Sequence, residues 1–209
     1  MKIDKDFKEA LANLPSKEKD KLILRLLKRD VDLVNKLYFE LMETMSVEEK
    51  RTEMELNISR LTSVYTQRYY SPGYLLMEIR DVSGSITEHV KTTKDKFGDI
   101  ALNIQMLSET LMRNEPNLSK ETYGKSYTFN IYVVARVYKI LTQIKKLHED
   151  LQYDLKESLA ILAEHIGRQD SLMRVCINNA LDMNWLFQFE IPSDIEFRVK
   201  ELRRMGFLK

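Results

Sequence analysis

The segment SYTFNIYVVARVYKILTQIKKLH, residues 126–148, indicates the fold class more clearly than any other stretch of the sequence. Its apolar side chains recur at helical spacing and form two stripes. The first stripe contains Tyr127, Ile131, Val134, Tyr138 and Leu141, and the second contains Val133, Val137, Ile140, Ile144 and Leu147. A helix that is apolar on two faces packs against neighbours on both sides. We therefore predict that this segment is the central helix of an all-α domain.

Helical periodicity also extends outward from this segment in both directions. Ser46 and Glu49 have the spacing of a capping box, and the apolar stripe that follows them predicts a long helix ending at the Ser71-Pro72-Gly73 turn. Similar stripes continue to the C-terminal helix, which Gly206 ends. We expect eight to ten helices in total, joined as antiparallel hairpins and packed as an irregular bundle or a short α-solenoid.

The composition excludes several other classes of protein. The 209 residues include only 6 Gly and 4 Pro, too few for the turns of a many-stranded sandwich or barrel. Lys and Arg number 33 against 32 Asp and Glu, and 44% of residues are hydrophobic, so the chain should bury a core. The single Cys176 cannot form an internal disulfide. Without a secretion signal or a long apolar run, the sequence predicts a cytoplasmic, non-membrane protein.

The sequence indicates one domain over residues 1–209. The stretch from Arg113 to Gly124 contains Pro116 and reads as the longest structureless segment, so a subdomain boundary near 113–124 is the one alternative. Residues 1–45 read as three short helices, which either form an arm or join the main core. No internal repeat of helical-array length occurs.

Charge and motif spacing exclude several functions. Basic residues are spread evenly along the chain, so we do not expect a nucleic-acid partner. The glycines are isolated, which excludes a phosphate loop or a dinucleotide fingerprint. The three histidines, His89, His148 and His165, lack the spacing of a zinc or di-iron site. We therefore expect no cofactor.

One acidic arrangement offers an enzymatic alternative. Glu49 and Glu53 are spaced to share one helix face, and Glu78 and Asp81 are spaced to share a face of the next helix. Carboxylates on adjacent helices can hold Mg²⁺. Glu78-Ile79-Arg80-Asp81 resembles the second acidic motif of the all-α nucleotide pyrophosphohydrolase family, which implies a Mg²⁺-dependent hydrolase. Glu49 and Glu53 depart from that family's Glu-x-x-Glu motif by one residue.

A second cluster combines aromatic and basic residues around the Ser71-Pro72-Gly73 turn. Its members are Tyr65, Arg68, Tyr69, Tyr70 and Tyr74. Tyr and Arg are enriched among the residues that dominate the energy of protein interfaces, so the cluster is a candidate partner-binding surface. In the structural alternative, Tyr65 and Tyr69 simply continue the buried stripe of their helix.

Three short motifs support a family resemblance. They are Leu14-Pro15-Ser16-Lys17-Glu18-Lys19, the run from Leu22 to Leu27 before Asp30, and the turn at Thr93-Lys94-Asp95. With them, the chain resembles a family of uncharacterised all-helical bacterial proteins, best in its first half. The resemblance implies a helical-hairpin fold and no known activity.

Two functional hypotheses follow. The preferred one is a non-enzymatic helical scaffold that binds another protein or a second copy of itself, because no complete catalytic constellation is present. The alternative is the Mg²⁺-dependent hydrolase that would use the four carboxylates named above.

Overall fold

A computed structural model describes residues 4–208, and all regular secondary structure over that range is helical, with no strand. The helices are α1 (Lys5–Ala12), α2 (Ser16–Leu27), α3 (Val31–Met42), α4 (Val47–Gln67), α5 (Pro72–Thr93), α6 (Lys96–Leu118), α7 (Tyr123–Ile144), α8 (Glu149–Tyr153), α9 (Lys156–Gly167), α10 (Asp170–Asn178), α11 (Asn184–Phe187) and α12 (Ile195–Arg204). All but α8 and α11 have eight residues or more. The predicted all-α fold is confirmed.

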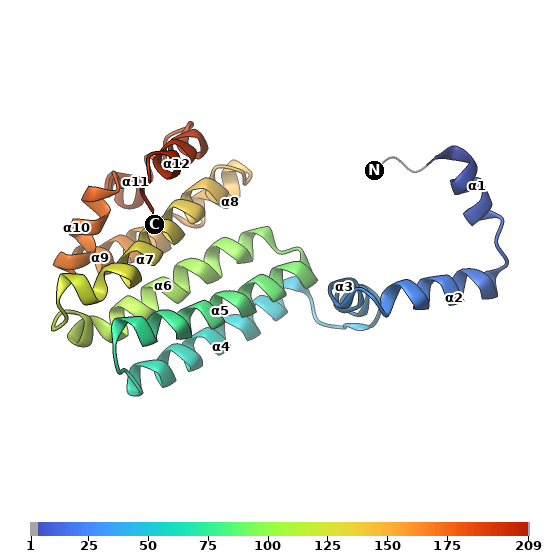
Figure 1. Cartoon of the computed structure of the whole chain (residues 1–209), viewed down its shortest axis with the longest axis horizontal. Helices are drawn as coiled ribbons and strands as arrows, with labels where there is room; N and C mark the ends of the chain where they lie inside the picture. The colour runs from blue at the N-terminus through green and yellow to red at the C-terminus, as the bar shows by residue number, and fades with distance from the viewer. Residues whose placement is uncertain (1–3, 209) are drawn as a thin grey trace.

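Helices α6 and α7 form the centre of the body, which comprises α4 to α12 (Figure 1). Helix α7 contacts α5, α6, α10 and α12, so the prediction that residues 126–148 form a central helix is confirmed. Helix α6 contacts α4, α5, α7 and α9 and is equally central. In a solenoid each repeat contacts only its neighbours, whereas α6 also packs on α9, so the body is an irregular bundle.

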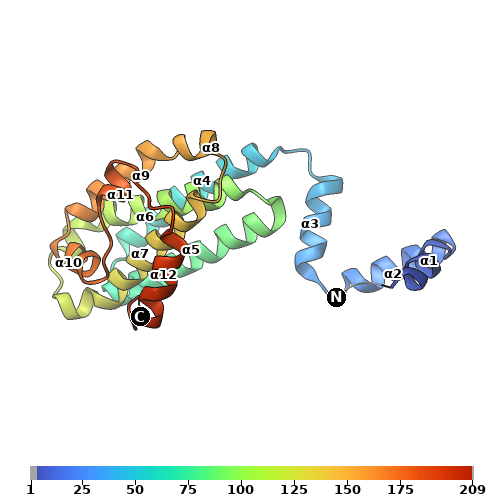
Figure 2. The same cartoon turned by 90° about the horizontal axis from the view of Figure 1, so that it is seen from above.

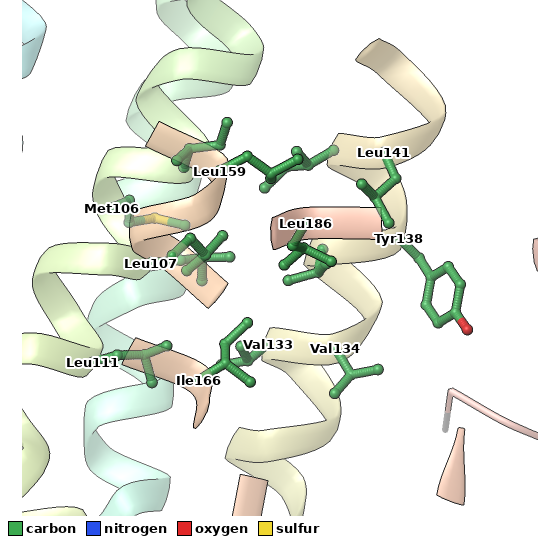
Figure 3. Close-up of a cluster of buried hydrophobic side chains, with 14 of the residues drawn as sticks. Met106, Leu107, Leu111, Val133, Val134, Tyr138, Leu141, Leu159, Ile166 and Leu186 are labelled. Atoms are coloured by element: carbon green, nitrogen blue, oxygen red, sulfur yellow. The ribbon is translucent and has the colours of Figure 1, made fainter. Parts of the chain in front are cut away.

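A central part of the core lies where α6, α7, α9 and α11 meet (Figure 3), and the core extends to α4, α5, α10 and α12. Leu107 from α6, Val133 from α7 and Leu186 from α11 point into this space and are fully buried. Both apolar stripes of α7 are buried apart from their ends, where Tyr127 is 39% exposed and Leu147 lies beyond the end of the helix. Burial of each large apolar side chain contributes about 1.5 to 3 kcal/mol, so this cluster dominates the stability of the body.

The predicted break at residues 113–124 is wrong over its first half. Helix α6 continues through Pro116 and ends at Leu118. Pro116 has no N–H to donate to the Met112 carbonyl, so α6 lacks one hydrogen bond near its end, but the helix continues for two residues beyond the proline. The short connection that remains, residues 119–122, does not divide the core, because α6 and α7 pack directly on each other.

The contact between α4 and α6 contains a polar cluster. The Glu109 carboxylate accepts hydrogen bonds from the hydroxyl of Thr62 at 2.9 Å and the side-chain amide of Gln105 at 2.8 Å, and from Ser59. Burial raises the pKa of Glu109, but these donors outweigh burial and hold the pKa below its usual value. The cluster aligns α4 on α6 through directional bonds as well as apolar packing.

The first three helices form an arm that stands apart from the body. Figures 1 and 2 both show α1 and α2 projecting away from α4 to α12. From Asp4 to Ser46 no residue is buried, and none belongs to the hydrophobic core. The body begins where Ser46 caps α4, in the predicted capping box with Glu49. Residues 1–45 were expected to be either an arm or part of the core, and in the described residues they form an arm.

Residues 4–208 contain twelve helices. None of them combines the length and the apolar character that crossing a bilayer requires.

Candidate protein-interaction surface

The arm exposes an unusual number of large apolar side chains for its length. In a water-soluble monomer such residues are scattered singly, and contiguous apolar patches mark binding sites. Ten large apolar residues of α1 to α3 are 37% exposed or more: Phe7, Ile23, Leu24, Leu26, Val31, Leu33, Val34, Tyr38, Leu41 and Met42. The arm is therefore the strongest candidate for a functional surface in the part of the chain that the structure describes.

The exposed residues of α3 form one continuous stripe. Val31, Val34, Tyr38 and Leu41 follow one another at intervals of three, four and three residues, which places them on one face of the helix. Their exposed fractions are 70%, 38%, 63% and 75%, so most of the stripe faces solvent. This spacing is that of the contact seam between two packed helices, and α3 carries it without a partner.

Helix α2 carries a second, shorter stripe. Ile23 and Leu26 are three residues apart and about half exposed, at 50% and 53%. Leu27 extends the same face and is half-buried. We call the exposed apolar faces of α2 and α3 the arm stripes.

The two helices that carry the arm stripes have opposite charge. Residues 16–29, which contain α2, hold six basic and two acidic residues, a net charge of +4. Residues 30–43, which contain α3, hold four acidic residues and one basic residue, a net charge of −3. The whole chain has a net charge of only +1, so this separation is a local property of the arm.

Helix α3 is the part of the arm that touches the body. It lies against α5, where Asp32 pairs with Lys91 at 3.0 Å across the contact. A groove of about 340 Å³ separates the two helices and is lined by Tyr38 and Phe39 on the arm and His89 on α5. Because α3 contacts the body on this side only, most of its apolar stripe stays free.

The connection between α3 and α4 is held by charged groups. Lys50 pairs with Glu43 at 3.0 Å and with Glu53 at 3.2 Å. The hydrogen bond to Lys50 lowers the pKa of Glu43, and the same contacts raise the pKa of Lys50. Both groups are near the surface, so the contribution of these pairs to stability is small.

The structure divides the predicted aromatic and basic cluster. Tyr65 and Tyr69 pack against the core, as the structural alternative expected. Burial raises the pKa of Tyr69 far above its usual value, and its hydroxyl lies 3.3 Å from the Glu121 carboxylate. These two tyrosines are therefore largely structural.

The other three members of the cluster are exposed. Tyr70 is 83% exposed, Tyr74 is 42% exposed, and Arg68 also faces solvent at the end of α4. Three side chains form a far smaller surface than the arm stripes. Their role in partner binding stays a prediction.

The first pair of the acidic arrangement is engaged locally. Glu49 accepts a hydrogen bond from the Ser46 backbone N–H at 2.7 Å and so completes the capping box. Glu53 forms its ion pair with Lys50. Both carboxylates lie in the first two turns of α4.

The second pair lies toward the opposite end of α4. Helices α4 and α5 are joined by a short turn at residues 68–71 and pack on each other, so Glu78 and Asp81, in the first three turns of α5, lie beside the last turns of α4, which contain Tyr65. Tyr65 follows Glu53 by twelve residues, about 18 Å along the helix axis. The four carboxylates therefore do not converge. Among residues 4–208, no three Asp, Glu, His or Cys side chains are arranged to hold a metal ion.

The sequence predicts the three arm helices, but it does not predict that their apolar faces are exposed. Their apolar residues have the spacing of core residues, and spacing alone does not say what buries them. The opposite charges of residues 16–29 and 30–43 were the available signal, because helices that pack together in one body need no such separation.

Comparison with protein-family models, curated proteins and solved structures found no match to this chain. The resemblance to uncharacterised all-helical bacterial proteins therefore stays a prediction.

Proposed function

We propose that this chain is a protein-interaction domain in which the body, α4 to α12, presents the arm as its binding surface. The single observation that supports the proposal is the solvent-exposed stripe of α3, formed by Val31, Val34, Tyr38 and Leu41. A helix presented this way binds by laying its apolar face into a groove or against another helix.

The energetics of the arm support the same proposal. Twelve-residue helices such as α2 and α3 are marginal in water unless tertiary packing supports their apolar face. Within one copy, α2 has no contact with the body comparable to that of α3 on α5. A partner that covers the arm stripes would supply the missing burial, about 1.5 to 3 kcal/mol for each large side chain that becomes fully buried.

Co-purification from the native cells tests this proposal. The tagged full-length chain is compared with the variants Val31→Glu and Leu41→Glu, which place a charge on the α3 stripe. We expect the wild type to retain partner proteins, including untagged copies of the chain, and both variants to lose most of them. The residues are 70% and 75% exposed, so the substitutions should leave the body folded.

The matched control is Leu56→Glu on α4. Leu56 is 69% exposed and lies on the body, so the same charge there should leave co-purification unchanged. The proposal is contradicted if the arm variants retain the same proteins as the wild type, or if the control loses them to the same extent.

A further inference from the structure

We infer that the partner of the arm is a second copy of this chain, with α2 of each copy packed on α3 of the other. This inference deepens the proposed function and rests on it, because it identifies what covers the arm stripes. In such a twofold pair the contact of α2 with the partner's α3 occurs twice.

The exposed apolar area is sufficient for a stable pair. Six exposed large apolar residues form the arm stripes, with exposed fractions between 38% and 75%: Ile23, Leu26, Val31, Val34, Tyr38 and Leu41. At roughly 100 Å² each, they offer on the order of 600 Å² of apolar surface per copy, and a standard stable interface buries about 800 Å² per partner, of which about 56–58% is apolar. The arm of a second copy would therefore match the area that needs to be covered.

Charge favours contact of α2 with the partner's α3 over contact of α2 with α2 or of α3 with α3. Residues 16–29 have a net charge of +4 and residues 30–43 a net charge of −3. Contact of α2 with α2, or of α3 with α3, would bring like charges together, whereas contact of α2 with α3 brings opposite charges together. Within one copy the two helices meet only at their shared corner. Asp32 and Glu43 of α3 pair with Lys91 and Lys50 of the body, but each lysine also pairs with a second carboxylate, Glu88 or Glu53, so the surroundings of α3 stay acidic.

The position of the arm allows this pairing. Figures 1 and 2 show α1 and α2 extending from one end of the molecule, clear of the body. Two copies can approach through their arms while the bodies remain on opposite sides. Helix α3 can keep its contact with α5, because Tyr38 is the only one of the four stripe residues that lines the groove between the two helices.

The first measurement is the molar mass of the purified full-length chain by multi-angle light scattering over a range of concentrations. We expect a dimer for the wild type. Leu26→Glu on α2 and Leu41→Glu on α3 should each weaken the dimer at least tenfold, because each substitution damages both copies of the contact. Leu56→Glu should leave the dimer unchanged, and circular dichroism checks that all three variants keep the helical body.

The second measurement mixes the α2 variant Leu26→Lys with the α3 variant Leu41→Glu, one of them carrying a size tag. Each variant alone should be mainly monomeric. In the mixed pair one contact is entirely wild type and the other combines opposite charges, so a mixed dimer should form. If α2 packed on α2 and α3 on α3, every contact would contain a damaged helix and mixing would restore nothing.

The outcomes separate this inference from the proposed function. A wild-type chain that stays monomeric at the highest concentration, or variants that do not recover on mixing, overturn the pairing of α2 with α3. If the same arm variants still lose their co-purified proteins, the arm binds a different protein and the proposed function stands. If co-purification is also unchanged, both are overturned.

Discussion

Arg51 and Asp95 form a two-point ion pair that joins the first turns of α4 to the start of α6. Arg51 Nε lies 2.6 Å from Asp95 Oδ2, and Arg51 Nη2 lies 2.9 Å from Oδ1. The Asp95 side chain is only 3% exposed, and it also accepts the Gly98 backbone N–H at 2.7 Å and so caps α6. This pair lies close to the point where the arm meets the body, because α4 begins at Val47.

The Asp95 carboxylate should make the body sensitive to acid. Burial raises its pKa, but His89, Arg51 and the Gly98 N–H outweigh burial and hold the pKa well below its usual value. A carboxylate with a lowered folded-state pKa stabilises the protein above its unfolded-state pKa of about 3.9, and this stability is lost as the pH falls through the folded-state value. We expect Asp95→Asn to lower the free energy of unfolding by about 3 kcal/mol at pH 7.

Denaturant unfolding between pH 2 and pH 7 measures this effect. The difference between wild type and Asp95→Asn should be constant above about pH 5 and shrink toward lower pH. Asp150→Asn is the control, because the Asp150 side chain is 91% exposed and its loss should cost little. A difference between wild type and Asp95→Asn that does not change with pH contradicts the role of the ionised carboxylate.

Gly98 should be intolerant of a side chain. A Cβ atom at this position would lie 2.0 Å from Asp95 Oδ2, so Gly98→Ala would displace the capping carboxylate. We expect a loss of at least about 2 kcal/mol in the free energy of unfolding, because the cap and the buried ion pair are disturbed together. Thermal unfolding followed by circular dichroism measures it.

Gly84→Ala is the matched comparison for Gly98→Ala. Gly84 lies inside α5, and no neighbouring atom lies within 4 Å of the place that an alanine Cβ would occupy. Alanine should therefore stabilise the helix by about 0.5 to 1 kcal/mol. Opposite signs for the two substitutions are expected. Equal effects would show that the close approach of Asp95 to Gly98 is not decisive.

The two halves of the aromatic cluster should respond differently to truncation. Tyr69→Ala removes a side chain that packs on the core and should lower the melting temperature by several degrees. Tyr70→Ala and Arg68→Ala change exposed residues and should leave it nearly unchanged. Destabilisation by Tyr70→Ala would contradict its position at the surface.

Magnesium ions and nucleoside triphosphates should leave the melting temperature unchanged. A ligand stabilises a protein by binding preferentially to the folded state, and Glu53 lies too far from Glu78 for the two to share one cation. Thermal melting with a panel of nucleoside triphosphates, with and without Mg²⁺, provides the measurement. A saturable rise in melting temperature would support the hydrolase hypothesis instead.

Much of the body could be predicted from the sequence. The two stripes of residues 126–148 predict the central helix, and the Ser46–Glu49 spacing predicts the start of α4, because both signals depend on local geometry. The break expected at Pro116 is wrong, because the proline is accommodated in the last turn of α6. The polar cluster around Glu109 joins residues 47 to 50 positions apart in the chain, and no local pattern indicates such a contact.

The candidate site could be predicted only in part. The apolar period of α3 looks the same whether the body or a partner covers it, so Val31 and Leu41 gave no sign of their exposure. The distance between Glu53 and Glu78 also depends on how α4 and α5 are aligned. The spacing of residues within one helix does not determine that alignment. The arm surface therefore required coordinates.

Hydrogen exchange of the full-length chain, measured at low and high protein concentration, shows whether the arm needs a partner to become stable. We expect the backbone amides of α2 and α3 to exchange rapidly in dilute solution, because their apolar faces lack support, and at least about tenfold more slowly when concentrated. Amides of α6 and α7 should exchange slowly at both concentrations. Amides of α2 and α3 already as protected as those of α7 in dilute solution would contradict the claim that the arm needs a partner.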